Sequence, residues 1–173
     1  RRGGRMTSTR PVFNIKEETL MPPIAVGEKA PAFTLKNQNG QDVKLSDLRG
    51  QNVLLAFYPL DFSPVCTKEH ACFVDDLKQF EGLKARVLGI SIDSFYAHKA
   101  YAEKMKISYP LLADFHPKGE VAKKFGLYLE DKGITNRATV ILDKDGVVRY
   151  LKVYDIPQQR NNQELLSELK KLG

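Results

Sequence analysis

Cysteine is scarce in this chain. Cys66 and Cys72 are the only two cysteines in 173 residues, and they do not form a Cys-x-x-Cys pair. The pattern therefore argues against a disulfide framework and against a thiolate zinc site. The histidines, His70, His98 and His116, have no paired-ligand spacing. We therefore expect neither a metal nor a cofactor.

The sequence also lacks a segment suited to a membrane. No uninterrupted apolar run approaches the roughly 20 residues that a membrane-spanning helix needs. The first residues hold no apolar segment that resembles a secretory signal. We therefore expect no membrane partner and a protein that works in the cytoplasm. An organelle is the alternative, if the arginine-rich start is a transit segment.

Positive charge is not gathered in one block. The formal net charge is +6, and residues 1–20 supply +3 of it. The remainder is spread thinly along the chain, so we expect no nucleic-acid partner. We interpret residues 1–23 as a flexible basic arm, a tag remnant or a targeting segment, and the sequence does not choose among these. Residues 24–173 are expected to form a single domain with one core.

The most informative stretch runs from residue 53 to residue 80. Residues 53–58 are continuously apolar, as expected of a strand covered on both faces, and Pro59 ends it. After Pro64 the apolar pattern changes to steps of three and four, which predicts an amphipathic helix. Its inward face would carry Cys66, His70, Phe73, Leu77 and Phe80. The pattern places Cys66 in the first turn of this helix.

The position of Cys66 has a chemical consequence. Unpaired N–H groups at a helix N-terminus and the positive end of the helix dipole both favour an anion. The thiolate is the reactive form of cysteine, so Cys66 is a candidate nucleophile. A small apolar residue packed at the end of a helix is an equally good interpretation of its position alone.

Strands and helices alternate along the rest of the chain. Asn39-Gly40 predicts a hairpin turn between two short strands within residues 33–45, and Ser46 is expected to cap a single helical turn. Further strands are predicted at 85–92, 110–113, 138–143 and 147–154, and helices after Ser94, at 120–125 and after Asn161 or Asn162. This order predicts an α/β fold with an N-terminal β-hairpin and a central mixed β-sheet flanked by helices on both faces.

Three residues near Cys66 could assist it. Ser63 could cap the helix, which its spacing favours, or bond an oxygen of a bound ligand. Glu69 lies in the first helical turn, where a carboxylate favours the dipole with or without a catalytic duty. Pro59 could restrict the loop before the helix, or simply end the strand.

Pro59, Ser63 and Cys66 reproduce the spacing P-x-x-x-(T/S)-x-x-C, and in this the sequence resembles the peroxiredoxin family. The segment Asn136-Arg137-Ala138-Thr139, just before a predicted strand, resembles the active-site arginine segment of that family. The resemblance extends from about residue 24 to the end of the chain. Within the family it points to the peroxiredoxin Q (bacterioferritin comigratory) and alkyl hydroperoxide reductase E types.

The resemblance implies a thioredoxin-like fold and a thiol-specific peroxidase, acting on hydrogen peroxide and organic hydroperoxides. Cys66 would be the peroxidatic nucleophile that becomes a sulfenic acid, and thioredoxin or another thiol would recycle it. Ser63 would hold the peroxide, Arg137 would stabilise the thiolate, and Pro59 would shield the pocket. The alternative is a redox sensor or a thiol-disulfide exchange protein on the same fold. The resemblance is compatible with a monomer and with a homodimer.

Cys72 leaves several interpretations open. Peroxiredoxin Q carries its resolving cysteine five positions after the peroxidatic one, whereas Cys72 follows Cys66 by six. In the alkyl hydroperoxide reductase E type a second cysteine need not lie in this helix. Six helical residues rise about 9 Å, but bridged Cα atoms lie about 4.4 to 6.8 Å apart, so a disulfide would require local unwinding. Cys72 is a resolving cysteine, an inert one or an intermolecular partner.

Overall fold

The computed structural model describes residues 21–173, so the arm predicted at residues 1–23 lies almost entirely outside the described residues. Within the described residues, no helix is long and apolar enough to cross a membrane. The elements in chain order are β1 (Thr34–Lys36), β2 (Asp42–Lys44), the 3-10 helix η1 (Leu45–Leu48), β3 (Asn52–Phe57), α1 (Pro64–Gly82), β4 (Ala85–Ser91), α2 (Phe95–Met105), β5 (Leu111–Ala113), α3 (Glu120–Lys124), β6 (Tyr128–Leu129), β7 (Ile134–Thr135), β8 (Arg137–Leu142), β9 (Val148–Tyr154) and α4 (Asn162–Lys170).

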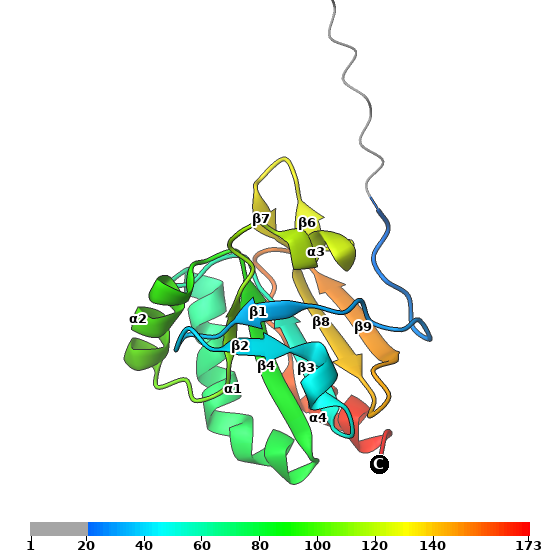
Figure 1. The fold of residues 1–173 in the computed structure, drawn as a ribbon. Helices are drawn as coiled ribbons and strands as arrows, with labels where there is room; N and C mark the ends of the chain where they lie inside the picture. The colour runs from blue at the N-terminus through cyan, green and yellow to red at the C-terminus, as the bar shows by residue number, and fades with distance from the viewer. Residues whose placement is uncertain (1–20) are drawn as a thin grey trace, which may run out of the picture.

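A seven-stranded mixed sheet forms the centre of the molecule, in the order β2-β1-β5-β4-β3-β8-β9 (Figure 1). Strand β3 pairs in parallel with β4 and antiparallel with β8. The predicted strand-helix-strand unit is therefore β3-α1-β4, with its two strands parallel as a crossover requires. The predicted N-terminal hairpin is the antiparallel pair β1 and β2.

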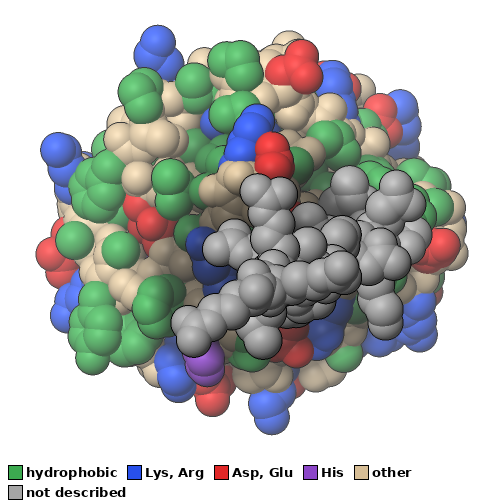
Figure 2. All heavy atoms as spheres, turned by 90° about the horizontal axis from the view of Figure 1, so that it is seen from above, with side chains coloured by type: hydrophobic (Ala, Val, Ile, Leu, Met, Phe, Trp, Pro, Cys, Tyr) green, Lys and Arg blue, Asp and Glu red, His purple; other side chains and the backbone are tan. Residues whose placement is uncertain are grey.

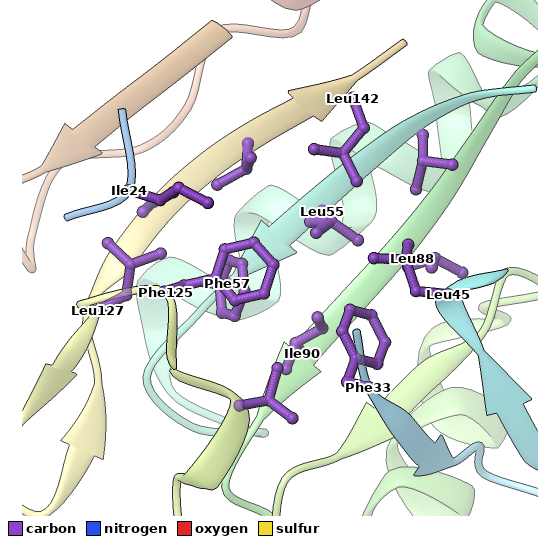
Figure 3. Close-up of a cluster of buried hydrophobic side chains, with 14 of the residues drawn as sticks. Ile24, Phe33, Leu45, Leu55, Phe57, Leu88, Ile90, Phe125, Leu127 and Leu142 are labelled. Atoms are coloured by element: carbon purple, nitrogen blue, oxygen red, sulfur yellow. The ribbon is translucent and has the colours of Figure 1, made fainter. Parts of the chain in front are cut away.

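Helices cover both faces of the sheet, as predicted. Leu54 and Ala56 of β3 face a core shared with α1, α2 and α4, whereas Val53, Leu55 and Phe57 face the opposite core. That second core receives Phe125 at the end of α3, together with Ile24 and Phe33 (Figure 3). The prediction of an α/β, thioredoxin-like fold is confirmed.

Local details differ from the predictions at two places. Ser46 lies inside η1, whose N-cap is Lys44 with no side-chain cap bond, so the serine does not open that turn. The two-stranded sheet of β6 and β7 was not predicted, because two-residue strands are too short to show a period of two. Ser94 and Asn161 do cap α2 and α4 through their side chains.

Strand β3 ends at Phe57, and residues 58–63 form the loop that leads into α1. In the loop Phe62 has a φ of 63°, in the left-handed region that a bulky residue rarely adopts. Seen from above Figure 1, the visible surface mixes hydrophobic side chains with side chains of both charges (Figure 2). No single sign of charge dominates that view.

Candidate active site

Cys66 is the third residue of α1 and is fully buried. The apolar stripe predicted from sequence turns it inward, because Phe73 and Phe80 on the same face pack into the core beneath the sheet. Leu77 is only partly buried at the edge of that core. The helix N-terminus and the sulfur therefore lie at the end of β3, under the loop of residues 58–63.

Arg137 reaches the sulfur directly. Its Nη2 donates to Cys66 Sγ at 3.3 Å, and its Nε donates to the carbonyl of Ile156 at 2.9 Å. The register of the sheet explains the approach: Phe57 pairs with Ala138, so Arg137 at the start of β8 sits beside the end of β3. The structure thus brings together two residues, 71 positions apart, that the sequence had proposed as partners.

Glu69 lies one helical turn after Cys66 and joins two arginines. Its Oε2 accepts from Arg137 Nη1 and, at 2.8 Å, from Arg160 Nη1. Its Oε1 accepts from the backbone N–H of Arg160 at 2.9 Å. The carboxylate is buried, so it pairs with fixed cations rather than facing solvent at the helix dipole. We call Cys66, Glu69, Arg137 and Arg160 the arginine cluster.

Sequence reasoning missed Arg160. Its guanidinium donates to the carbonyls of Phe57 and Ala138 and, at 2.9 Å, to the hydroxyl of Thr139. Burial lowers the pKa of Arg160 from its usual range, while the Glu69 carboxylate opposes that effect. No sequence signal marks this residue, because it stands in a polar loop before α4 and meets Glu69 from 91 positions away.

The charge of the arginine cluster favours a thiolate. Two guanidinium groups are buried here against a single carboxylate. Buried charges are stable only when they are paired, so the cluster needs one more negative charge to be neutral. A thiolate at Cys66 would supply that charge at hydrogen-bonding distance from Arg137. The arrangement suits nucleophilic chemistry at sulfur better than inert packing.

Ser63 occupies the N-cap position of α1, but its side chain makes no cap hydrogen bond. Instead its hydroxyl donates to the carbonyl of Leu60 at 3.0 Å, which leaves its lone pairs and the N–H groups of Val65 and Cys66 available to a ligand. The capping role that the spacing favoured is therefore wrong. Pro59 is buried at the start of the same loop.

Cys72 lies apart from the arginine cluster. Both cysteines are free thiols, and Cys72 is only half-buried. Its Sγ accepts from the side-chain amide of Gln159 at 3.2 Å. Gln159 immediately precedes Arg160, so Cys72 contacts the same loop that holds Glu69. The helix is continuous between the two cysteines, which keeps the sulfurs apart.

His70, also on the inward face of α1, is neutral in the folded protein. Burial first, and then the positive charges of Arg160, His98 and Arg137, lower the pKa of His70 to about 3. Its Nδ1 lies 2.6 Å from the hydroxyl of Tyr109. His70 therefore fills the core between charged groups without adding a charge of its own.

The chain is similar to proteins of a known family. The model of the AhpC/TSA family matches residues 26–151. Alkyl hydroperoxide reductase E of Mycobacterium bovis is 40% identical over 129 residues, which cover 74% of this chain and 84% of the relative. The chloroplastic peroxiredoxin Q of Sedum lineare is 36% identical over 163 residues, which cover 94% of this chain and 87% of the relative.

Solved structures show the same fold. The reduced 2-Cys peroxiredoxin of Plasmodium vivax aligns with a TM-score of 0.79 at 31% identity, covering 86% of this chain and 81% of that one. The AhpC of Enterococcus faecalis aligns with a TM-score of 0.79 at 31% identity, covering 84% of this chain and 90% of that one. With a family model over most of its length and relatives this similar, the chain belongs to the AhpC/TSA family of peroxiredoxins and is a peroxidase of the oxidoreductase class.

Proposed function

We propose that this protein reduces hydrogen peroxide and organic hydroperoxides through the thiolate of Cys66, and that thioredoxin or another thiol recycles it. The observation that carries the proposal is the contact of Arg137 Nη2 with Cys66 Sγ at 3.3 Å, inside a buried cluster that lacks one negative charge. Membership of the family supports the same chemistry.

The first step is a displacement at oxygen. The Cys66 thiolate attacks the terminal oxygen of the peroxide, the O–O bond breaks, and the other oxygen leaves as water or an alcohol after taking a proton. Cys66 becomes a sulfenic acid. Arg137 offers fixed donors on one side of the sulfur. The free N–H groups of the first turn and the Ser63 hydroxyl can hold the peroxide oxygens on the other side.

The second step returns the sulfur to a thiol. A thiolate attacks the sulfenic sulfur and water leaves, which forms a disulfide that a second thiol then reduces. Cys72 can supply the first thiol only if α1 unwinds between residues 66 and 72. Unwinding would also remove Cys72 from Gln159. Otherwise an external thiol attacks Cys66 directly.

The proposal is tested with Cys66→Ser, which should abolish peroxide consumption in the presence of thioredoxin and its reductase. Rapid consumption by this variant would show that another group carries the chemistry. If the wild type oxidises at Cys66 but turns over poorly with every thiol supplied, the protein is a redox sensor instead. Catalysed reduction of a disulfide substrate such as insulin, without peroxide, would indicate thiol-disulfide exchange.

Intact-mass measurement after one equivalent of peroxide separates the two recycling routes. A loss of about 2 Da in the wild type that Cys72→Ser removes would show an internal disulfide. A gain of about 16 Da in both proteins would show a sulfenic acid that waits for an external thiol.

A further inference from the structure

A second polar cluster joins the loop of residues 58–63 to residues on the β4 and β5 side of β3. The side chains of Asp61 and His98 are fully buried, and Asp61 Oδ2 lies 2.7 Å from His98 Nδ1. Tyr58 donates its hydroxyl to Asp61 Oδ1 at 2.7 Å. We call Tyr58, Asp61, Asp93 and His98 the aspartate cluster.

His98 ties Asp61 to strand β5 through its two ring nitrogens. His98 Nδ1 faces the Asp61 carboxylate, and His98 Nε2 faces the carbonyl of Leu112 at 3.1 Å. His98 is therefore held between the Asp61 carboxylate and the backbone of β5, and its contact at 2.7 Å fixes the Asp61 side chain.

The backbone of the loop is tied to the same cluster. The N–H of Asp61 donates to Asp93 Oδ2 at 2.9 Å, and the hydroxyl of Ser91 donates to the same oxygen at 2.5 Å. Burial and the nearby Asp61 raise the pKa of Tyr58 well above its usual range, so its hydroxyl remains a donor. Hydrogen bonds thus fix the side chain of Asp61 to Tyr58 and His98, and its backbone to Asp93.

This fixation acts on a strained segment. Phe62, the residue after Asp61, has a φ of 63°. That conformation is unfavourable for a bulky side chain and persists only where surrounding contacts determine it. Phe62 packs on the ring of Tyr101 with the centroids 4.8 Å apart, and Ser63 follows it directly. The contacts of Asp61 and Phe62 therefore decide where the Ser63 hydroxyl points.

An alternative interpretation is that the aspartate cluster binds a metal cation. One ligand atom from each of Asp61, Asp93 and His98 lies within 4.8 Å of the others. However, Asp61 and His98 already satisfy each other, and Asp93 Oδ2 already accepts two hydrogen bonds. A metal would have to displace these bonds, so the hydrogen-bonded pair explains the geometry better.

We propose that Asp61 and His98 are positioning residues for the peroxidase, because their buried hydrogen bond holds the left-handed turn at Phe62 and so places Ser63 over Cys66. The inference rests on the proposed function. Neither residue touches the sulfur, and both act through the loop. Their removal should therefore impair the reaction with peroxide without impairing the thiolate, which belongs to the arginine cluster.

The experiment compares two second-order rate constants of Cys66. One is the rate constant with hydrogen peroxide, measured by competition with a reporter peroxidase, and the other is the rate constant of alkylation by iodoacetamide. For Asp61→Ala we expect the peroxide rate constant to fall about 10- to 100-fold, because a small misplacement of an orienting group has effects of this size. Alkylation should stay unchanged or become faster, since a released loop uncovers the sulfur. An unfolded chain would also lose the peroxide rate while its exposed thiol was still alkylated, so circular dichroism and urea unfolding must first show that Asp61→Ala is folded.

Conservative and paired variants sharpen the test. Asp61→Asn can accept from Tyr58 and donate its amide to a neutral His98, so every hydrogen bond survives and the peroxide rate constant should stay within about threefold of the wild type. His98→Leu should lower the peroxide rate constant as much as Asp61→Ala does. The double variant should be no slower than either single variant, because both changes remove the same contact.

The matched control is Asp42→Ala, which removes an exposed ion pair on the β1-β2 hairpin.

Each result decides the matter. A wild type that does not react with peroxide overturns the proposed function and this inference together. If the wild type reacts with peroxide, any of three results overturns the inference alone. Asp61→Ala could react with peroxide as fast as the wild type, or the losses in the double variant could be additive. Asp61→Asn could also react with peroxide as slowly as Asp61→Ala. If Asp61→Ala does not fold, Tyr58→Phe decides: a selective fall of about threefold or more supports the positioning role, and no change overturns it.

Discussion

The arginine cluster and the aspartate cluster lie on opposite sides of β3 and are built from different chemistry. The arginine cluster uses residues of α1, β8 and the loop before α4, and two guanidinium groups that stay charged at any working pH. The aspartate cluster uses residues of the loop of residues 58–63, next to β4 and in α2, and its central contact is the hydrogen bond between Asp61 and His98. The first cluster contains the sulfur, and the second contains two residues of the loop of residues 58–63.

The difference separates two tasks that a peroxidase must combine. Permanent charges suit the stabilisation of a thiolate and of developing negative charge, because they need no proton transfer to become effective. A hydrogen-bonded pair suits the fixing of a loop, because it has a strict geometry and little net charge. Variants of the two clusters should therefore fail in different ways.

The largest effect is expected for Arg137→Met. This change removes the donor at 3.3 Å from Cys66 Sγ and leaves Glu69 with one cation fewer. The rate constant with peroxide should fall about 100- to 1000-fold, the range found when one donor to a developing anion is removed. Alkylation by iodoacetamide at pH 7 should also slow, unlike in Asp61→Ala. Equal alkylation of this variant and the wild type would mean that Arg137 does not stabilise the thiolate.

For Arg160→Met we expect a smaller fall in the rate constant with peroxide than for Arg137→Met. The main effect of this change should be on the free energy of unfolding. Arg160 does not touch the sulfur, but it contacts Glu69, Thr139 and the carbonyl of Phe57. Breaking a buried pair on one side lowers the free energy of unfolding by about 3 kcal/mol or more. We expect about a tenfold slower reaction with peroxide, through the loosened Glu69. Urea unfolding and peroxide competition measure the two quantities, and unchanged stability would contradict the role given to Arg160.

His70 lies between the clusters and should control acid stability. Its pKa is about 3 in the folded protein and near 6.5 when unfolded. Below pH 6.5 protons therefore bind the unfolded chain more readily than the folded one. The contribution of neutral His70 to the free energy of unfolding is fully present above pH 6.5 and is lost as the pH falls toward 3. From pH 7 to pH 4 the wild type should lose about 3 kcal/mol through this group. His70→Gln should lack this part of the loss in urea unfolding at the two pH values.

The smallest effect is expected away from both clusters. Asp42→Ala removes the 2.9 Å ion pair with Lys36, both of whose side chains are exposed. Such pairs contribute about 0.5 kcal/mol or less. Peroxide and alkylation rates should equal those of the wild type. A change in either rate would show that charge at a distance, rather than the two buried clusters, sets the reactivity of Cys66.

Local sequence was sufficient for the parts of the site that lie close together in the chain. The apolar run at 53–58 and the change of period after Pro64 predicted β3, α1 and the buried position of Cys66. The resemblance carried by Pro59, Ser63, Cys66 and the segment around Arg137 pointed to the family, and the comparisons confirm it. Of the two interpretations of Ser63, the side-chain cap is wrong, because its hydroxyl donates to the carbonyl of Leu60 instead of a helix N–H group.

The sequence by itself determined the fold class and the place of Cys66 in the first turn of α1, because periodicity and a helix start are local properties of the chain. Only the tertiary structure decided what surrounds them. Arg160 reaches Glu69 across 91 positions, and His98 reaches Asp61 across 37. Such contacts follow from the pairing of strands and the packing of helices, which bring polar residues with no pattern of their own into the same buried space. Charge balance and donor count then decide how each behaves.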